Sequence, residues 1–598
     1  MKKRRVRVRN MTSSDIPGER AQLIDFPFDS KLPTVLEDQS FGVNWPVVYI
    51  LNSEKEAYIG ETSNASQRMS EHLKNCERTR LTTSTIVYDS SFNKSVILDL
   101  ESTLILYMTT DGRYELQNRN AGQSQAHNYY QRAAYQTRFN QIWQDLIDHQ
   151  MARKSLEEIQ NSNLFKFSPY KTLTVDQYRV CMDVISIILK KNAEQAGLTT
   201  YQQFEVPSDP IFVKGSAGTG KTVLAVYLVK AFSELAHYSK EDILSLSDRF
   251  SWLTEDETLL EEAAKLSPGF KIGLVIPVTS MQKTLKNVFR ELKMASVKVV
   301  SPQDAAKEKW DLLIVDEAHR LRQRKNITGY KAFDDTCRRL GLDKHKASQL
   351  DWILKCSRFQ VFLYDVAQHV MPSDAPEEAF RKWLHSATHI FSLSSQMRCR
   401  GGEDYLNYVK KIFSDCPPET RLSFSDEYTF SIYESAAHLQ AEIVSLNQVW
   451  GLCRMVAGYG WDWITRKEKS IHTDPELFDF ELDGHRFIWN SVQSDWVNSE
   501  HALDEVGCIH TIQGYDLNYV GVLIGPEVVI NPQTQRIDVD LSNYYDKKGK
   551  AGTDFEEVRD SILRTYAVLC SRGIRGTLIY AVNPEVREYL KRYCPVVL

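Results

Sequence analysis

The chain has 598 residues, of which 42% are hydrophobic and 25% are charged, and its formal net charge is −5. These proportions are typical of an ordinary globular protein, and they exclude a disordered chain, a collagen-like chain and a small disulfide scaffold. At about 150 residues per domain, the length predicts roughly four compact units. A nucleic-acid-binding protein is more often basic, so such a role must depend on local patches of charge.

No apolar run approaches the roughly 18 residues that a membrane-spanning helix needs, so we expect no membrane partner. The ten cysteines are scattered, and no C-x-x-C pair occurs among them. The usual spacing of a zinc cluster is therefore missing. Free thiols are typical of a reducing cytoplasm, which is where we expect the protein to be.

Residues 1–40 are predicted to be a basic, flexible lead, because six of the first nine residues are Lys or Arg. No apolar core follows them, so they do not form a secretory signal. Two interpretations stay open for this lead: a solvated tail, or an arm that binds phosphate groups.

Residues 41–122 alternate short strands with helices. Strands are predicted at VVYIL, AYIGE and STIVYDS, and a helix follows them from about residue 95 to residue 109. Residues 123–168 are rich in Gln, Asn and Ser and contain one helical stretch. This composition predicts a linker.

From residue 169 to the end, the chain has the pattern of an α/β protein. Apolar runs of strand length end where helices are predicted to begin, which is typical of strands buried on both faces of a parallel sheet. We place a first sheet unit at 169–385 and a second at 386–598. The runs of the first unit are 211–213, 272–276, 312–315 and 361–364, and those of the second are 390–393, 430–433, 455–457, 520–524 and 577–581.

Two segments carry opposite charges, which offset each other in the net charge of the whole chain. An acidic insert is predicted at 233–268, and its residues 240–262 carry eight acidic and two basic side chains. Residues 320–346 carry nine basic and three acidic side chains. We predict that the basic segments face a common groove and that the acidic insert faces away from it. The other interpretation is that both segments are solvated surface.

A phosphate-binding loop follows the first strand of the first sheet unit. The residues GSAGTGKT match the pattern G-x-x-x-x-G-K-[ST], with a strand before them and a helix after them. In this pattern, glycines let backbone N–H groups approach the phosphates, Lys221 reaches the β and γ oxygens, and Thr222 holds Mg²⁺. The helix start adds affinity for anions. The predicted ATP-binding residues of the loop are Gly215, Ser216, Ala217, Gly218, Thr219, Gly220, Lys221 and Thr222.

Further residues complete the predicted ATP site. After the strand DLLIV, Asp316 is placed to bind Mg²⁺ through water, and Glu317 is placed to polarise the attacking water. Gln177, ahead of the loop, is placed to read an adenine edge. Gln368 is predicted to sense the γ-phosphate. Two arginines are predicted to supply positive charge to the phosphoryl transition state, and they are Arg398 and Arg572. Each of these glutamines and arginines alone is also compatible with an ordinary surface or capping residue.

The order of these elements resembles a superfamily one helicase over about residues 165–598. The matching elements are TVDQY, GSAGTGKT, VIPVTSMQKTL, IVDEAH, YDVAQ, SSQMRC, IHTIQGYDLNYVGVLIG and YAVLCSRGIRGTLIY. FKFSPYKTLTVDQ and RMVAGYGWDW are most similar to the bacterial relatives of the Schlafen-type helicase domain. The resemblance implies two RecA-like lobes with ATP in the cleft between them. It also implies nucleic-acid contacts around Thr279, Ser280, Thr511, Gln513 and Gly514.

One motif departs from the pattern of this superfamily. Members that unwind strongly usually end in a Thr-Arg-Ala motif, whereas this chain has Ser571-Arg572-Gly573. The arginine is kept, so the resemblance implies ATP hydrolysis, but it does not imply processive unwinding.

Residues 41–122 hold a second set of candidate residues. Arg68 and His72 are four apart on one helix and so share a face. Glu101 lies in the middle of an apolar helix face, where a carboxylate is costly unless it meets a cation or a metal. Phosphodiester cleavage needs a base, a cation and a metal, and Tyr49 or Tyr58 with these three residues would supply them. Plain packing of the tyrosines, and an ion pair for Glu101, are the alternatives.

The order Tyr, Tyr-Ile-Gly, Arg, His, Glu, Asn resembles the GIY-YIG nuclease family over about residues 45–122. The resemblance implies a small α+β domain with a three-stranded antiparallel sheet, which hydrolyses DNA with one Mg²⁺ held by Glu101. The residues that carry over to this family are Tyr49, Tyr58, Arg68, His72, Glu101 and Asn118. The first motif departs from the family because it reads Val47-Val48-Tyr49, without the family's glycine or isoleucine.

We therefore expect an ATP-driven nucleic-acid translocase or helicase joined to a Mg²⁺-dependent endonuclease, with DNA or RNA as partner and anti-phage defence or DNA repair as its setting. Two alternatives stay open: an ATPase with a non-cleaving DNA-binding module, and a regulatory NTP switch that binds a protein. The sequence does not decide whether the chain forms a homo-oligomer.

Overall fold

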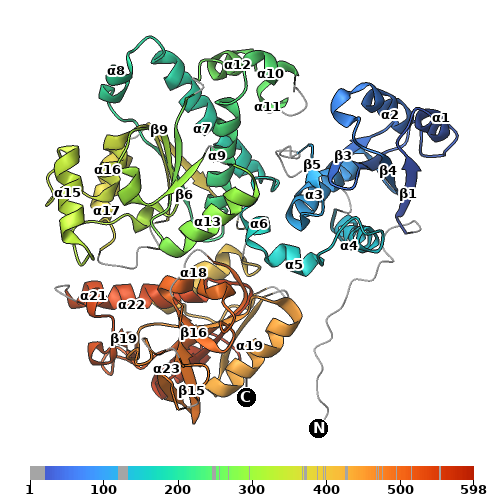
Figure 1. Cartoon of the computed structure of the whole chain (residues 1–598). Coiled ribbons are helices and arrows are strands. Elements are labelled where there is room, and N and C mark those ends of the chain that lie inside the picture. Colours follow the sequence, from blue (N-terminus) through green and yellow to red (C-terminus); the bar gives the residue numbers. More distant parts are fainter. Residues whose placement is uncertain are drawn as a thin grey trace, which may run out of the picture. The chain divides into compact units, whose positions relative to one another are not determined.

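The computed structural model describes most of the chain, as two compact units (Figure 1). The first unit comprises the residues up to 178 together with 246–252, and the second comprises 179–245 and 253–598. The described residues are 20–118, 132–245, 251–254, 256–266, 269–294, 297–365, 368, 373–386, 388–394, 396, 399–424, 428–466, 468, 470–474, 476–492, 495–512, 515–550 and 554–597.

The first unit is built on a five-stranded sheet with the order β1-β4-β2-β3-β5. Its strands are β1 (Gln22–Pro27), β2 (Val47–Asn52), β3 (Glu56–Thr62), β4 (Thr83–Tyr88) and β5 (Glu115–Leu116). The three predicted strands are β2, β3 and β4, and β2 pairs antiparallel with both of the others. The sheet is larger than predicted, because β1 pairs antiparallel with β4 and β5 pairs parallel with β3.

The prediction of a flexible lead over residues 1–40 is wrong from residue 20 on. β1 pairs with β4 along its whole length, and helix α1 (Leu32–Glu37) follows it. Phe28, Leu32, Leu36 and Phe41 are buried in the core of this unit. The charge of the first nine residues carries no information about these apolar positions, which decide the fold. Residues 1–19 lie outside the described part of the chain.

Two helices of the first unit carry most of its candidate residues, and asparagine side chains begin both. Asn64 accepts a hydrogen bond from the backbone of Gln67 at the start of α2 (Ala65–Lys74). Asn93 caps α3 (Lys94–Asp111) in the same way. Gly112, with a φ of 71°, ends α3 in the left-handed conformation that favours glycine. These caps fix where each helix begins and hence which residues face the sheet.

The described part of the segment predicted as a linker, residues 132–168, belongs to the first unit. Its helices are α4 (Arg132–Asp148), α5 (Leu156–Asn161) and α6 (Asn163–Lys166). The ring of Tyr107 on α3 lies 4.9 Å from Phe139, 5.5 Å from Trp143 and 4.9 Å from Phe165, measured between ring centroids. These aromatic contacts hold the segment against α3, although its polar composition predicted a linker.

The second unit contains two parallel-sheet lobes, as predicted. We call the part with the first sheet, up to β11, the first lobe, and the part from α18 on the second lobe. The sheet of the first lobe has the order β11-β6-β10-β9-β7-β8, and each of its pairings is parallel. Its strands are β6 (Ile211–Gly215), β7 (Ile272–Val275), β8 (Lys298–Val300), β9 (Trp310–Val315), β10 (Ser357–Tyr364) and β11 (His389–Leu393).

The predicted boundary between the lobes at 385/386 is wrong, and so is the assignment of 390–393 to the second sheet. β11 pairs parallel with β6, from His389 opposite Ile211 to Leu393 opposite Gly215. It is therefore an edge strand of the first sheet. A short apolar run has the same pattern in either sheet, so its register to β6 was not readable from the sequence.

The sheet of the second lobe has eight strands in the order β14-β15-β16-β13-β17-β20-β12-β21. Its pairings are parallel except for the β14–β15 hairpin. A separate antiparallel pair is formed by β18 (Val528–Ile530) and β19 (Ile537–Val539). The sheet strands are β12 (Thr429–Tyr433), β13 (Arg454–Ala457), β14 (Phe480–Leu482), β15 (His485–Trp489), β16 (Glu505–Cys508), β17 (Leu517–Ile524), β20 (Gly573–Ala581) and β21 (Val596–Val597).

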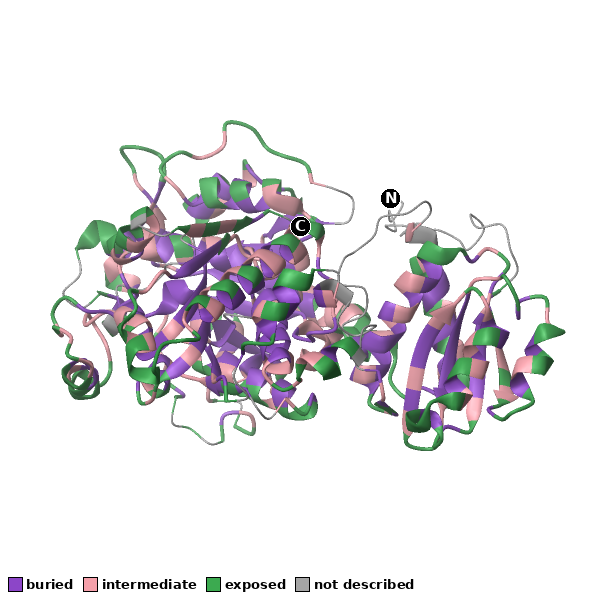
Figure 2. Ribbon diagram, turned by 90° about the horizontal axis from the view of Figure 1, so that it is seen from above, coloured by how far each residue is buried: buried purple, intermediate pink, exposed green. Residues whose placement is uncertain are grey.

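Helices cover these sheets, and exposed positions gather on the helices and loops while the strands are mainly buried (Figure 2). The helices that precede the second lobe are α7 (Val175–Glu194), α8 (Thr200–Glu205), α9 (Lys221–Leu235), α10 (Lys240–Ser245), α11 (Ser251–Thr254), α12 (Glu257–Ala263), α13 (Thr279–Glu291), α14 (Pro302–Ala305), α15 (Tyr330–Leu340), α16 (Gln349–Cys356) and α17 (Glu377–Ser386). Those of the second lobe are α18 (Gly402–Ile412), α19 (Ala436–Trp450), α20 (Ile509–Ile512), α21 (Lys547–Lys550), α22 (Phe555–Cys570) and α23 (Pro584–Lys591). Within the described residues, no helix is both long enough and apolar enough to cross a membrane.

Several cations of the basic segment at 320–346 form ion pairs with carboxylates of the protein. Arg320 pairs with Asp374 at 2.7 Å, and Arg324 and Lys344 both pair with Asp334, at 2.6 and 3.0 Å. Carboxylates within or near the segment therefore compete with any external phosphate for these cations. The common basic groove stays a prediction, because the basic residues before residue 20 lie outside the described part of the chain.

Candidate functional site

The phosphate-binding loop runs from the end of β6 to the start of α9, as the sequence pattern predicts. Gly218 and Gly220 have φ values of 88° and 78°, a left-handed conformation that costs other residues energy. A Cβ on Gly215 would lie 2.4 Å from the Thr219 hydroxyl oxygen. The glycines are therefore needed for the backbone path itself, which turns N–H groups and the start of α9 toward a bound anion.

Lys221 is the first residue of α9, and its ammonium group is folded over the loop. Nζ donates hydrogen bonds to the carbonyl oxygens of Gly215 at 2.7 Å and Ser216 at 3.0 Å. The side chain is buried, with 5% of its surface exposed. A cation held this close to the loop's N–H groups makes the pocket suitable for phosphate oxygens.

Thr222 and Asp316 meet although they are far apart in sequence. The Thr222 hydroxyl donates a hydrogen bond of 2.6 Å to Oδ2 of Asp316 at the end of β9. Asp316 is fully buried, and burial together with the neighbouring Glu317 carboxylate raises its pKa. A hydroxyl and a buried carboxylate are oxygen donors of the kind that Mg²⁺ prefers, so the two residues fit the predicted metal site. Within the described residues, no group of three or more His, Cys, Asp or Glu side chains is arranged around a metal position.

Glu317 has an unusual backbone conformation, with φ 51° and ψ 44°. A residue other than glycine adopts this region at a cost of about 1–3 kcal/mol, which is found mainly where function requires a fixed orientation. Oε2 of Glu317 lies 2.9 Å from Nε2 of His319. Burial opposes ionisation, but the charges of His319, Lys221 and Arg572 lower the pKa of Glu317. Glu317 is therefore held as a carboxylate, which can accept a hydrogen bond from water.

His319 was not singled out from the sequence, and its contacts fix the orientation of Glu317. Its Nδ1 accepts a hydrogen bond of 3.2 Å from the backbone N–H of Asp365. Nδ1 thus faces the backbone of Asp365, and Nε2 faces Glu317. The signal in the sequence was the position of the histidine two residues after Glu317.

Gln368 and Arg572 join the two lobes at this site. The Arg572 guanidinium donates a hydrogen bond of 3.1 Å to Oε1 of Gln368, whose amide donates one of 2.8 Å to Asp365. Both side chains are buried, with 4% of Gln368 and 1% of Arg572 exposed. The structure thus brings these two predicted residues together, next to Glu317. The other predicted arginine, Arg398, lies outside the described residues.

Further contacts between the lobes involve residues that the sequence reasoning did not assign. Ser216 in the phosphate loop donates to Glu403 on α18 at 3.1 Å, and Gln396, in the connection between β11 and α18, donates to the carbonyl of Ala217 at 2.6 Å. At another point of the interface, the hydroxyls of Thr284 and Tyr515 lie 2.8 Å apart. The loop is therefore in direct contact with the second lobe, so lobe movement alters its surroundings.

Gln177 stays a prediction as the adenine-reading residue. It lies in the first turn of α7 and is fully buried, and its side-chain oxygen accepts a hydrogen bond of 3.0 Å from the backbone of Thr174. Gln177 belongs to the first unit and the phosphate loop to the second.

Most of the predicted nucleic-acid contacts have buried or undescribed side chains. Thr279 is exposed at the start of α13, whereas Ser280 next to it is 4% exposed. Thr511 is buried, and its hydroxyl donates a hydrogen bond of 3.0 Å to the carbonyl of Cys508. Gln513 and Gly514 lie outside the described residues. Of this set, Thr279 is the described residue that presents its side chain to solvent.

The candidate nuclease residues of the first unit converge on the Tyr49 hydroxyl. This oxygen accepts a hydrogen bond of 3.2 Å from Nε of Arg68 and lies 2.7 Å from Nε2 of His72. The ring of Tyr58 lies 4.9 Å from that of His72. A Cβ on Gly60, which pairs with Tyr49 across β2 and β3, would lie 2.2 Å from the Tyr49 oxygen. The glycine of the Tyr-Ile-Gly motif is thus required by the position of the hydroxyl.

Protonation states in this cluster follow from burial. Burial raises the pKa of Tyr49 well above its usual value, so the phenol is protonated at neutral pH. Burial and the charges of Arg68 and Arg78 lower the pKa of His72 to about 4, so its imidazole is neutral. Since Arg68 donates to the phenol oxygen, the phenol proton is directed to His72. A neutral imidazole bonded to a phenol is suited to accept a proton.

Glu101 and Asn118 have different surroundings. Glu101 lies on α3, partly exposed, and its charge contributes to the raised pKa of Tyr49, which places the carboxylate near that phenol. As a single carboxylate it fits a site at which one protein ligand holds Mg²⁺. Asn118 is buried and bonds to both backbone groups of Ile59, accepting from the N–H at 3.1 Å and donating to the carbonyl. Asn118 therefore positions β3, the strand that carries Tyr58.

Arg78 was missed by the sequence reasoning. Its guanidinium carbon lies 4.0 Å from the centre of the Tyr58 ring, and its NH1 donates a hydrogen bond of 2.6 Å to Gln117. The side chain is 9% exposed. It adds a second cation to the cluster, and it was not predictable from spacing because it lies in a short turn after α2.

Comparison with family models identifies a helicase domain in this chain. The model of the Schlafen group 3 DNA/RNA helicase domain matches residues 208–583. An uncharacterized protein of Saccharomyces cerevisiae is 24% identical over 451 residues, which are 70% of this chain and 91% of that protein.

Three solved helicase structures were also found. The arterivirus nonstructural protein 10 helicase has a TM-score of 0.28 and 14% identity, over 68% of this chain and 64% of that one, so the chain spans less than two thirds of its length. The Pif1 helicase from Candida albicans has a TM-score of 0.23 and 12% identity, over 66% and 99% of the two chains. The Bacteroides Pif1 helicase in complex with ADP-AlF3 and ssDNA has a TM-score of 0.24 and 13% identity, over 67% and 94%.

Proposed function

Because the chain belongs to the Schlafen group 3 DNA/RNA helicase family, we propose that its second unit hydrolyses ATP at the phosphate-binding loop and uses the cycle to move along a DNA or RNA strand. The hydrogen bond from Arg572 of the second lobe to Gln368 of the first carries this proposal. It makes the catalytic arrangement depend on the relative position of the lobes, which is what a motor requires.

The roles of the residues follow from their contacts. Lys221 and the N–H groups of the loop hold the phosphates, and Mg²⁺, when bound by Thr222 and Asp316, neutralises phosphate charge. Glu317 accepts a hydrogen bond from the attacking water and orients it. Arg572 places positive charge where the transition state develops negative charge.

The test of this proposal is ATP hydrolysis with and without single-stranded nucleic acid. We expect wild-type protein to hydrolyse ATP faster when a strand is added, and both Lys221→Ala and Glu317→Gln to lose hydrolysis while keeping their thermal stability. An exposed cation outside the site, Lys298 on β8, provides the control variant Lys298→Ala. Hydrolysis unchanged by Lys221→Ala would overturn the proposal, and hydrolysis unaffected by nucleic acid would favour a regulatory switch.

For the first unit we propose Mg²⁺-dependent cleavage of phosphodiester bonds. The convergence of Arg68 and His72 on the Tyr49 hydroxyl, with Glu101 near it, supports this proposal. His72 takes the proton that Tyr49 releases as the phenol activates water, Arg68 binds the phosphate, and Glu101 is the residue that would hold the metal.

Nicking of DNA and RNA in Mg²⁺ or Mn²⁺ tests the nuclease proposal. We expect Glu101→Gln to abolish nicking and to leave ATP hydrolysis intact. Glu54→Gln is the matched control, since Glu54 is an exposed glutamate in the β2–β3 turn of the same unit. Wild-type protein that cuts no nucleic acid in either metal would refute the proposal and favour a non-cleaving binding module.

A further inference from the structure

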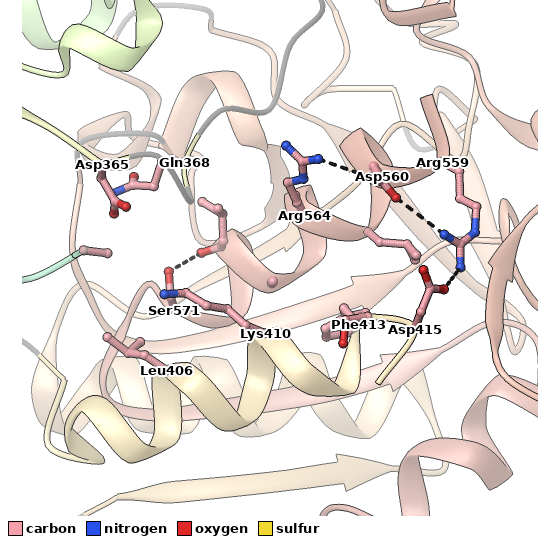
Figure 3. A pocket seen from close by; sticks show the side chains of 15 residues that line it. Asp365, Gln368, Leu406, Lys410, Phe413, Asp415, Arg559, Asp560, Arg564 and Ser571 are labelled. Carbon is pink, nitrogen blue, oxygen red and sulfur yellow. Dashed lines mark hydrogen bonds and ion pairs between the residues drawn. The ribbon is translucent and has the colours of Figure 1, made fainter. Parts of the chain in front are cut away.

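A cavity of about 340 Å³ lies in the second unit between α18 and α22. Its lining extends from the phosphate loop and Gln368 to Asp415 and Arg559 of the second lobe (Figure 3). At the inner end, Ala217, Asp365 and Gln368 of the first lobe form part of its wall. At the other end, the ion pair of Asp415 and Arg559 forms part of the wall, as Figure 3 shows. The cavity thus has walls from both lobes, and its volume is that of a small-molecule site, which is usually about 300–1,000 Å³.

The middle of the cavity is lined mainly by apolar side chains. Leu406 on α18, Phe413 just after it, and Leu563 and Val568 on α22 line the cavity, and these residues are 3%, 5%, 2% and 6% exposed. Ala567 adds a small side chain to the same wall, which leaves room between the helices. An apolar molecule that enters this space gains roughly 25 cal/mol for each Å² of apolar surface that leaves water.

The charged groups at the rim differ in whether they form ion pairs. Arg559 pairs with Asp415 at 2.5 Å and with Asp538 at 3.0 Å, and Arg564 pairs with Asp560 at 3.2 Å. Lys410 is an exposed residue of the cavity wall on α18. Within the described residues, no carboxylate lies within ion-pair distance of its ammonium group.

From these observations we propose that the cavity binds a small amphipathic anion, with a flat apolar body between α18 and α22 and one acidic group against Lys410. A wholly apolar ligand would form no ion pair with Lys410. A highly charged ligand would lose the hydration of its charged groups against the apolar wall, which is costly. A single anionic group on an apolar ring matches both parts of the lining.

Occupancy of this cavity affects the ATP site through Gln368. Gln368 forms part of the cavity wall and accepts the hydrogen bond of Arg572. A ligand that packs against α18, α22 and the first lobe together resists their separation, so we expect it to slow ATP turnover. This consequence rests on the proposed ATPase, whereas ligand binding itself does not.

The test uses the aromatic sulfonate 8-anilinonaphthalene-1-sulfonate, whose fluorescence rises in apolar surroundings, added to the full chain without ATP. We expect saturable binding to folded wild-type protein and a loss of affinity of about fivefold in Lys410→Glu, the effect of reversing one partly screened charge. Lys411→Glu is the matched control, because Lys411 is the next exposed lysine of α18 and is not part of the cavity wall. Equal affinity of both variants would overturn the proposal.

A second variant tests the apolar part of the site. Ala567→Phe places a ring in the cavity, and we expect it to abolish probe binding while the thermal unfolding midpoint shows that the protein is folded. Probe binding by folded Ala567→Phe with wild-type affinity would also overturn the proposal. Because binding is measured without ATP, a protein that binds the probe but hydrolyses no ATP would refute the proposed ATPase and leave this site standing.

Discussion

Replacing Arg572 with alanine removes a guanidinium that the second lobe places against Gln368 of the first, at 3.1 Å. Arg572 is 1% exposed, and its charge contributes to the lowered pKa of Glu317. Under the proposed mechanism, the variant loses the cation that stabilises the transition state, and it loses one of the charges that lower the pKa of Glu317. Arginines in this role contribute about 10³–10⁵ in rate, or about 4–7 kcal/mol of transition-state stabilisation.

Steady-state ATP hydrolysis at saturating ATP measures this loss as a fall in kcat. Arg575→Ala is the matched control, because Arg575 lies on β20, just after Arg572 in the chain, and its guanidinium carbon lies 3.6 Å from the centre of the Trp450 ring. We expect Arg575→Ala to keep the wild-type kcat. A kcat of Arg572→Ala within about tenfold of wild type, less than 1.4 kcal/mol, would refute the role assigned to Arg572.

Three further predictions concern the first unit. His72 has a folded-state pKa of about 4, below its unfolded value of about 6.5. The unfolded state therefore binds more protons between these values, and the free energy of unfolding falls as the pH drops from about 6.5 to 4. Denaturant unfolding at several pH values should show this slope, and His72→Gln should flatten it. Tyr49→Phe removes the hydroxyl bonded to Arg68 and His72, and a nicking assay should show a loss of about 10²–10⁴ with the fold kept; wild-type nicking would contradict the role of the phenol. Gly60→Ala places a Cβ 2.2 Å from the Tyr49 oxygen, and denaturant unfolding should show a loss of about 1–3 kcal/mol, whereas an unchanged midpoint would show that the hydroxyl moves freely.

The sequence predicted the local features that depend on residue type and spacing. The phosphate loop requires left-handed glycines and a lysine at a helix start, and the structure has this arrangement around Gly218, Gly220 and Lys221. The β-strands buried on both faces were visible as continuous apolar runs. The meeting of Thr222 with Asp316 agrees with the sheet pattern, since the carboxyl ends of parallel strands lie at one edge of a sheet, and only β10 separates β6 from β9.

The sequence did not predict features that depend on contacts between distant segments. β11 pairs with β6 rather than with the second sheet, and β1 pairs with β4, because hydrogen-bond register and not composition decides the partner. Tyr107 packs against a polar segment through its few aromatic residues. Arg78 and His319 gain their importance from neighbours across the fold, which a single sequence does not reveal.

Cleavage of forked, duplex and single-stranded substrates with and without ATP tests most directly the central claim that a helicase-family motor and a nuclease share this chain. We predict that wild-type protein cuts in Mg²⁺, that ATP changes the extent or position of cutting on forked substrates, and that Lys221→Ala removes this ATP effect while Glu101→Gln removes cutting. Cutting that is identical with and without ATP in wild-type and Lys221→Ala protein would contradict the coupling, and the absence of any cutting would contradict the nuclease.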